Sequence, residues 1–361
     1  MAIQWADSFS RYGVGNATRD RMRDGLPYNN WESKSQIDPD PLAAANGERC
    51  CYLHNVPENN ACGQNRIALP TPTAGTVGVA ARYWFPSFTS VGEARIVAAF
   101  MPLNPASNNY PDNLLASCRV ESNGALSIIS GVNGGYSPIA TTGGPVISTN
   151  AWNHIETSYN GTTGGMEVRL NGRTVLTGTS AKTGTIYFAN PIAGAGGVPD
   201  DVPIKDLVIW DGSGSRNNTF MGSVVVRRKA PQTDVTLGGW VPSTGSTGVP
   251  LLAKTAPNDT TYLSADDTPP AAMRYTLENL PDEVTSVRGI VTVVRARKID
   301  GGDANLQTSL ISGGDVDPGA DRPITTTFTY WYDISETDPD TGNAWTPASF
   351  DAADVEIDRT L

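Results

Sequence analysis

Charged residues are scarce in this chain of 361 residues, and basic residues are the scarcer kind. Asp, Glu, Lys and Arg make up only 17% of the sequence, where about 25% is usual, and 26 Lys and Arg face 37 Asp and Glu. Neutralisation of phosphates supplies most nucleic-acid affinity, so this acidic balance argues against nucleic acid as a partner. The sequence also lacks a run of 18 apolar residues, so we expect no membrane insertion.

Long amphipathic patterns are missing as well, whereas glycine and proline are abundant. The chain has 37 Gly and 26 Pro, about 17% of its residues together, against a usual figure of about 12%. Its apolar strings are short and rich in β-branched or aromatic residues, as in Thr76–Phe85, Arg95–Met101 and Trp152–Tyr159. Turn clusters every 8–12 residues or so are typical of an all-β sandwich or barrel. Only two short helices are expected, at Ala17–Asp24 and Pro347–Asp354.

The polar string Asp211–Asn218 is the best candidate for a domain boundary. A chain of this length predicts two domains, which we place at residues 1–213 and 214–361. The first part has 14 Lys and Arg against 17 Asp and Glu, and the second has 12 against 20, so most of the net charge of −11 belongs to the second. Strands are expected to restart at Ser223–Arg228. In Val284–Arg297, alternation places Ile290 and Val294 on one face of a strand and Val291 and Val293 on the other.

Cysteine is rare, and the four cysteines have no metal-binding spacing. They are Cys50, Cys51, Cys62 and Cys118, with no Cys-x-x-Cys pair among them. The first residues show no basic start followed by an apolar run, so we expect no secretory signal and therefore reduced thiols. A bridge from Cys50 or Cys51 to Cys62 is the competing interpretation.

The segment Asn150–Gly172 has the most specific pattern in the chain. Trp152 opens a strand, Val168–Gly172 (VRLNG) forms a hairpin, and Lys205–Asp211 (KDLVIWD) closes the series. This pattern resembles the laminin-G and concanavalin A-like lectin family, and the opening string WADSFSRYG resembles the first strand of such domains in bacteriophage proteins. The resemblance implies a concanavalin A-like jelly-roll β-sandwich for residues 1–213. We expect a second β-sandwich of jelly-roll type for residues 214–361.

The second part of the chain resembles a module of tailed-phage virion proteins. The strings that carry this looser resemblance lie at Trp240–Ser243, Asn258–Tyr262, Arg295–Lys298 and Glu336–Thr346. They imply a non-enzymatic structural protein of a bacteriophage virion, such as a tail fibre, spike or decoration subunit. Such a subunit would be made in the host cytoplasm, assemble with other virion proteins and attach to a host surface glycan. A homotrimer is the oligomer favoured for an appendage. The alternative is an architectural cement or joint protein without sugar binding.

A polysaccharide-degrading enzyme is the remaining alternative, because glucanases share the lectin-like fold. Glycoside hydrolysis needs two facing carboxylates, and the glucanases of this fold use a Glu-x-Asp-x-x-Glu strand. The nearest string here is Glu356–Asp358, which lacks the third carboxylate, and we expect it to be a solvated terminal strand. Only His54 and His154 could serve as a histidine base, and we expect His154 to be a satisfied structural residue. We therefore predict no catalytic residues.

Two kinds of binding site are compatible with the loops. Calcium takes six to eight oxygen ligands, and the loop with Asp211, Ser213 and Asn217 is a candidate for it, as are acidic turns at Asp200–Asp201 and Asp315–Asp321. No other cofactor is expected. A sugar ring needs an aromatic platform with polar partners, and we place it at Tyr136 with Asn133. The other aromatic candidates, of which at least half should pack in the core, are Tyr83, Trp84, Tyr159, Tyr330, Trp331 and Tyr332.

Overall fold

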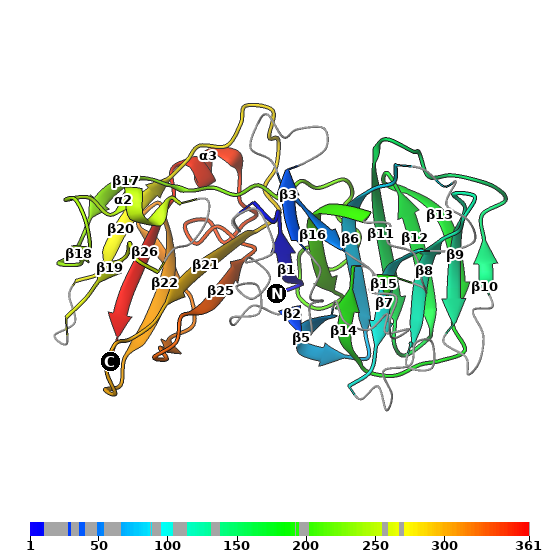
Figure 1. Cartoon of the computed structure of the whole chain (residues 1–361), viewed down its shortest axis with the longest axis horizontal. Coiled ribbons are helices and arrows are strands. Elements are labelled where there is room, and N and C mark those ends of the chain that lie inside the picture. The colour runs from blue at the N-terminus through cyan, green and yellow to red at the C-terminus, as the bar shows by residue number, and fades with distance from the viewer. Residues whose placement is uncertain are drawn as a thin grey trace.

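The structure is a computed structural model of the chain, and the fold of its described residues is nearly all β (Figure 1). It describes residues 1–10, 28–29, 36–39, 49–53, 66–86, 88, 95–103, 114–130, 138–191, 193–194, 202–254, 259–266 and 271–360. Residues 1–213 are called the first half below, and residues 214–361 the second half. The all-β prediction is confirmed: the first half is a two-sheet β-sandwich, and the second half adds further sheets around a core of its own.

Two eight-stranded sheets stack in the first half. Sheet A has, in spatial order, β13 (Arg173–Thr179), β12 (Gly165–Leu170), β11 (Trp152–Asn160), β6 (Thr76–Trp84), β16 (Val202–Asp211), β4 (Arg49–Leu53) and β3 (Gln36–Pro39), with β1 (Ile3–Asp7) also paired to β16. Sheet B has β10 (Pro138–Thr141), β9 (Leu126–Ser130), β8 (Ala116–Val120), β7 (Arg95–Met101), β14 (Ile186–Asn190), β5 (Arg66–Thr73) and β2 (Tyr28–Asn29), with β15 (Ala193–Gly194) on β7.

Period-two alternation builds the core between these sheets. Tyr83 and Phe85 of the β6 region point into it, whereas Trp84 between them lies on the outer face of sheet A. Phe100 from β7 meets Tyr159 from β11 across the gap, with ring centroids 5.4 Å apart. Burial raises the pKa of the Tyr83 hydroxyl well above its usual value, and this hydroxyl donates to backbone carbonyl oxygens.

One glycine lets two strands of sheet A fit a large ring. Gly78 of β6 lies opposite Trp210 of β16, and a Cβ built at Gly78 would lie 2.0 Å from the indole. Any side chain here would displace Trp210, which is buried against the outer face of sheet A. The glycine therefore sets the packing of this part of the sheet.

The second half contains one larger sheet and two small two-stranded sheets. Sheet C has β17 (Pro231–Thr236), β20 (Met273–Leu277), β26 (Asp354–Thr360), β22 (Asn305–Ser312) and β23 (Asp315–Pro318), with β24 (Arg322–Pro323) also on β22. The small sheets are β21 (Ile290–Ala296) with β25 (Thr329–Ser335), and β18 (Val241–Pro242) with β19 (Leu263–Ser264). The helices are α2 (Val249–Leu252) and α3 (Pro347–Asp351), and Thr346 and Ser349 form a capping box on α3.

The two-stranded sheet β21–β25 lies between the cores of both halves. Val291, Val293, Tyr330 and Tyr332 pack with the first-half core, while the opposite face, with Trp331, packs with the second-half core. This confirms the alternation predicted for β21. The Tyr332 and Trp5 rings, from opposite halves, have centroids 4.8 Å apart.

A buried carboxylate joins the N-terminal strand to the second half. Glu336 accepts hydrogen bonds from the backbone N–H groups of Ala2 and Ile3 at 2.7 and 3.2 Å, and from the Asn217 side-chain amide at 2.9 Å. The Asn217 amide also donates to the Arg288 carbonyl. Three segments that are far apart in the sequence are thus tied together at this junction.

Several predicted elements need correction. Ser223–Arg228 is extended but pairs with no strand of the described chain, because its polar groups bond to side chains of sheet A instead. Glu356–Asp358 is not a solvated terminal strand: β26 lies between β20 and β22, and its Val355 and Ile357 enter the core. The C-terminal helix is confirmed but ends at Asp351. The helix predicted at Ala17–Asp24 lies outside the described residues.

Other predictions are only partly addressed by the structure. Cys50, Cys51 and Cys118 are buried, and Cys62 lies outside the described residues, so the competing disulfide stays a prediction. The domain boundary at residue 213 also stays a prediction, since the two-stranded sheet β21–β25 contacts both cores. Within the described ranges, no helix is long and apolar enough to cross a membrane.

Candidate functional site

The outer face of sheet A carries a row of polar and aromatic side chains. In β11, Ile155 and Tyr159 face the core, so Trp152, His154 and Glu156 face outward on the same strand. Register places Trp84 opposite Trp152 and Arg82 opposite His154 on the neighbouring strand β6. Alternation therefore concentrates these side chains on one surface.

Residues Phe220–Val226, called the strap, cross part of this surface. The N–H groups of Met221 and Gly222 each donate to Glu156 Oε1 at 3.1 Å, and Val226 N–H donates to Asp206 Oδ1 at 2.9 Å. Arg82 completes the attachment through an ion pair with Asp206 and a hydrogen bond to Ser223 Oγ, both at 2.9 Å. The strap thus covers the outer face near Glu156.

His154 and Glu156 are both buried at this surface. Burial, followed by the nearby Arg82 charge, lowers the pKa of His154 to about 4, and neither ring nitrogen has a hydrogen-bond partner among the described residues. The expectation of a satisfied histidine is therefore wrong for the hydrogen bonds of its ring, whereas burial keeps the ring neutral. Burial also raises the pKa of Glu156, although the hydrogen bonds from the two N–H groups of the strap act to lower it. With side chains this buried, the pair has no access to a large substrate.

Two tryptophans lie at the end of the same face, where neither is buried. Trp84 and Trp152 are half-buried, with centroids 5.7 Å apart and planes at 62°. Lys205 of β16 places its ammonium nitrogen 4.7 Å from the Trp152 ring centroid. The arrangement combines an apolar ring surface with a positive charge, which suits a polar ligand that has one apolar face.

The sequence pointed to Trp84 only as one of several aromatic residues, and it named Trp152 and Lys205 as parts of the strand pattern but not as binding residues. The predicted sugar site at Tyr136 and Asn133 lies outside the described residues. The signal that could have found the tryptophan pair was alternation around Tyr83–Phe85, which directs Trp84 away from the core. The pairing of Trp84 with Trp152 depends on strand register, which one sequence does not reveal.

The predicted calcium residues take part in hydrogen bonds within the protein. Asp211 accepts from Gln4 Nε2 at 3.0 Å and from the N–H and hydroxyl of Ser213 at 2.8 and 2.5 Å. Asn217 instead donates to Glu336 and Arg288, so its amide nitrogen points to the junction. Among the described residues there is no group of three or more His, Cys, Asp and Glu side chains arranged for a metal. Calcium binding here stays a prediction.

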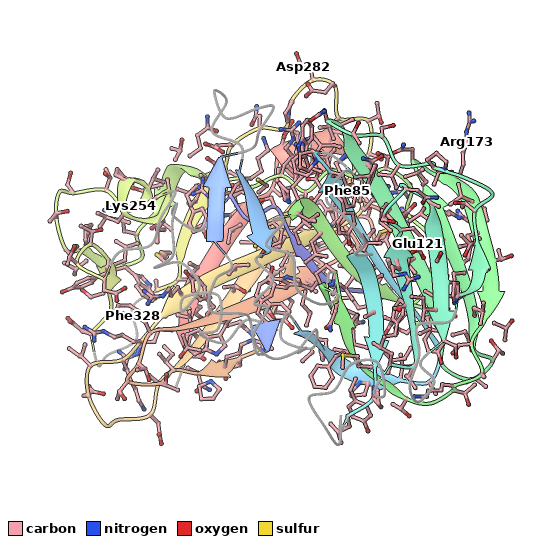
Figure 2. The ribbon with its side chains drawn as sticks, turned by 45° about the vertical axis from the view of Figure 1, so that its right-hand side comes forward. Phe85, Glu121, Arg173, Lys254, Asp282 and Phe328 are labelled. Atoms are coloured by element: carbon pink, nitrogen blue, oxygen red, sulfur yellow. The ribbon has the colours of Figure 1, made fainter. Side chains whose placement is uncertain are left out.

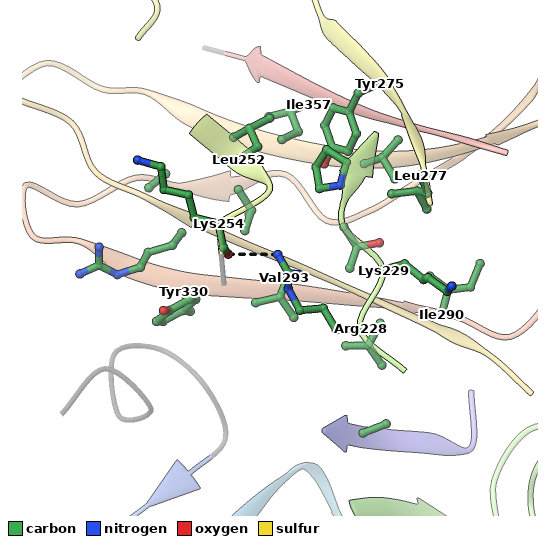
Figure 3. A pocket seen from close by; sticks show the side chains of 18 of the residues that line it. Arg228, Lys229, Leu252, Lys254, Tyr275, Leu277, Ile290, Val293, Tyr330 and Ile357 are labelled. Carbon is green, nitrogen blue, oxygen red and sulfur yellow. Dashed lines mark hydrogen bonds between the residues drawn. The ribbon is translucent and has the colours of Figure 1, made fainter. Parts of the chain in front are cut away.

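A large cavity, of about 1350 Å³, lies between sheet C, the two-stranded sheet β21–β25 and the segment 223–229, and first-half residues such as Ile3 and Asp7 also line it (Figure 3). Tyr275 and Ile357 line its sheet wall and Leu252 of α2 lies nearby. Arg228 crosses toward α2 and donates to the carbonyls of Ala253 and Lys254 at 2.9 and 3.0 Å. Figure 2 shows Arg173 projecting from the first half, whereas Lys254 and Phe328 lie on the other side of the molecule. The cavity is thus remote from β13.

Comparisons with known proteins identify no family for this chain. No protein-family model and no curated protein matches the chain. Similar solved structures include carbohydrate-binding module CBM66 from Bacillus subtilis (12% identity, TM-score 0.33, 51% of this chain and 97% of that one) and galectin LEC-6 from Caenorhabditis elegans (14%, 0.29, 40% and 91%). An alginate lyase of polysaccharide lyase family 7 is similar to the same degree (15%, 0.33, 52% and 94%). Similarity this low assigns no activity.

Proposed function

We propose that the chain is a non-enzymatic, glycan-binding structural protein that holds a sugar ring on Trp84 and Trp152. The observation that carries this proposal is the half-buried tryptophan pair on the outward face of a lectin-like sheet. An indole stacks on the apolar face of a sugar ring, while hydroxyl groups at the ring edge remain available to polar side chains. Loops and sheet ends with such rings are common ligand sites.

The charge near the platform narrows the class of glycan. Lys205 lies over Trp152. Because this cation lies beside the ring, a glycan with a carboxylate or another anionic group is favoured over a neutral one. We therefore propose an acidic surface polysaccharide as the ligand class.

The biological setting is proposed on the resemblance of short strings to tailed-phage proteins. The chain would serve as a fibre, spike or decoration subunit of a virion, be made in the host cytoplasm and associate with other virion proteins. A homotrimer is the expected assembly. Light scattering of the purified chain tests this part, and a monomer at micromolar concentration would contradict it.

Calcium binding is tested by the shift in melting temperature on adding calcium or EDTA, with Asp211→Asn as the comparison.

The glycan proposal is tested on a glycan array with the intact chain, two variants of Trp84 and the variant Tyr136→Ala. Trp84→Ala should reduce binding by about fivefold or more, because stacking of one ring contributes on the order of 1–3 kcal/mol, whereas Trp84→Phe should retain part of it. Circular dichroism checks that both variants fold. Equal binding by the parent chain and Trp84→Ala would sink this location, and loss only in Tyr136→Ala would move the site to the loop predicted from the sequence.

A purely architectural role is the second candidate, and it is favoured by the interlocked halves. The two-stranded sheet β21–β25 packs against both cores, and Glu336 joins the N-terminal strand β1 to Asn217. A joint or cement protein with this rigidity would bind virion partners and no glycan. Absence of binding to every glycan on the array supports this alternative, whereas release of reducing sugar from a host polysaccharide would support an enzyme.

A further inference from the structure

Strand β21 has one hydrogen-bonded edge and one unpaired edge. It pairs with β25 from Ile290–Ser335 to Ala296–Thr329, and no other strand of the described chain adjoins it. Arg322 donates to the Tyr332 carbonyl, so the backbone of Tyr332 points away from the β21–β25 ladder. Val293 lies directly opposite Tyr332, and the two residues of an antiparallel pair direct their backbone groups either toward each other or away from each other. The N–H and C=O groups of Val293 therefore also point away from β25. By the same alternation, Val291 and Arg295 present their N–H and C=O groups at the unpaired edge.

The cavity of the second half runs along this unpaired edge. All seven residues of β21 line it, whereas only Tyr330 of β25 does. Every residue of β21 is half-buried, so the edge is neither solvated like a surface strand nor covered like a central one. Backbone polar groups in such a position normally find a partner. The cavity provides the space in which that partner would lie.

One wall of the cavity is apolar. Met273 and Tyr275 of β20 and Val355 and Ile357 of β26 contribute buried side chains to the sheet wall. Extended peptides that add to a sheet edge gain affinity from main-chain hydrogen bonds and specificity from alternate side chains in pockets. An unpaired edge beside an apolar wall offers both kinds of contact to one extended strand.

Positive charge is concentrated around the cavity. Nine of the twelve Lys and Arg of the second half line it, but only three of its twenty Asp and Glu. The cations lie at both ends of β21, with Arg288 before it and Arg297 and Lys298 after it, and three more follow one another at Arg227, Arg228 and Lys229. The second half is acidic overall, so this distribution is the reverse of its net charge. The field at the cavity attracts an anionic occupant.

We propose that the unpaired edge of β21 binds an extended segment of a partner protein as an added strand. The segment has apolar side chains at alternate positions and acidic residues at both ends. The charges disfavour a second copy of this chain at the edge, because two cationic rims would face each other. The unpaired backbone groups disfavour an apolar anion such as a fatty acid, which has no donors or acceptors along its chain.

The test uses the intact protein and fluorescein-labelled nine-residue peptides. Each peptide has an alternating centre, such as Val-Thr-Val-Thr-Val with Ile or Phe versions at the valines, and two aspartates at each end. We expect saturable binding by fluorescence anisotropy for at least one peptide. The same peptide with lysines at its ends should bind at least about tenfold more weakly, and added salt should weaken binding of the acidic peptide.

Backbone pairing is separated from simple charge attraction by N-methylation and by one matched pair of variants. Methylating the amides on one side of the bound peptide should weaken binding about tenfold, because a lost hydrogen bond leaves a polar group unpaired, and methylating the other side should not. Val293→Pro removes an outward N–H and should weaken binding, whereas Val293→Thr keeps the N–H and should not. Arg288→Glu and Arg297→Glu should each weaken binding about fivefold. Circular dichroism checks that every variant folds.

Hydrogen exchange of individual amides gives a second readout that does not depend on the variants. The amides of Val291, Val293 and Arg295 should exchange slowly only when the acidic peptide is bound, whereas those of Thr292 and Val294 should be slow in both states. No binding across the peptide panel would overturn the proposal, as would equal binding of acidic and basic peptides. Protection of the outward amides in a self-associated free protein would assign the edge to a second copy, and binding of oleate without any peptide would assign it to an amphiphile. Either result would also overturn the proposal.

Discussion

The two halves use the same kind of strand but close their cores differently. Of the eight largest fully buried side chains in the described chain, seven belong to the first half and only Trp345 belongs to the second. Sheets A and B meet through rings such as Phe100 and Tyr159, whereas sheet C faces the two-stranded sheet β21–β25 across a cavity of about 1350 Å³. Two wide sheets can fill the space between them with side chains, but a wide sheet opposite only two strands leaves part of that space empty. The second half therefore retains a space and an unpaired strand edge.

The most severe test of this comparison removes one phenylalanine from each half. Phe100→Ala should cost about 3–5 kcal/mol of unfolding free energy, because it opens a new cavity in a filled core. Phe350→Ala borders the existing cavity and should cost at least about 1 kcal/mol less, because part of its surface contacts no packed neighbour. Urea denaturation of both variants measures the difference. Equal costs would show that the second half is as well packed as the first.

The next test concerns the contact between the halves. Glu336→Ala should reduce the unfolding free energy by about 2–3 kcal/mol, because it leaves buried N–H groups of Ala2 and Ile3 without an acceptor. Glu336→Gln retains one carbonyl oxygen and should cost less. Denaturation should show two transitions in Glu336→Ala if the carboxylate couples the halves. A single unchanged transition in both variants would remove this role from Glu336.

A smaller effect is expected from acid, and it belongs to the first half. The pKa of His154 is lowered to about 4 in the folded chain, so as pH falls the unfolded chain takes up the proton first. Because of this residue the free energy of unfolding falls as the pH is lowered from 6.5 to 4, and the decrease from pH 7 to pH 5 is about 2 kcal/mol. Comparing urea denaturation of the parent and His154→Phe at both pH values isolates the effect, because His54 is common to both. Parallel pH profiles would contradict it.

The smallest effect is expected for an ion pair on sheet C. Arg274 and Asp354 lie 2.6 Å apart, but Arg274 is 35% exposed, so a double-mutant cycle should give less than about 1 kcal/mol, falling with salt. The pair between Arg82 and Asp206 in the first half is 16% and 6% exposed and also holds the strap, so its coupling should be larger. A larger coupling in the second half would reverse the comparison.

Local patterns predicted most strand positions, since alternation is a property of neighbouring residues. Arg95–Met101 was predicted with the observed bounds, and the opposite faces of Val293 and Val294 were also predicted correctly. The error at Ser223–Arg228 arose because an apolar extended string looks the same whether it pairs with a strand or lies across a sheet as a strap. The position of β26 was missed because a terminal string carries no sign of the strands that flank it.

The sequence by itself determined that the chain is all-β, acidic and turn-rich, because composition and period-two alternation act within each strand. It also determined that Trp84 lies on the other face of its strand from Tyr83 and Phe85, because neighbouring side chains of a strand alternate. Only the tertiary structure brought Trp152 beside Trp84, placed Glu336 on the N-terminal strand and left one edge of β21 unpaired along a cationic cavity. These features depend on register and on which strands become neighbours. Both are settled by contacts between residues far apart in the sequence.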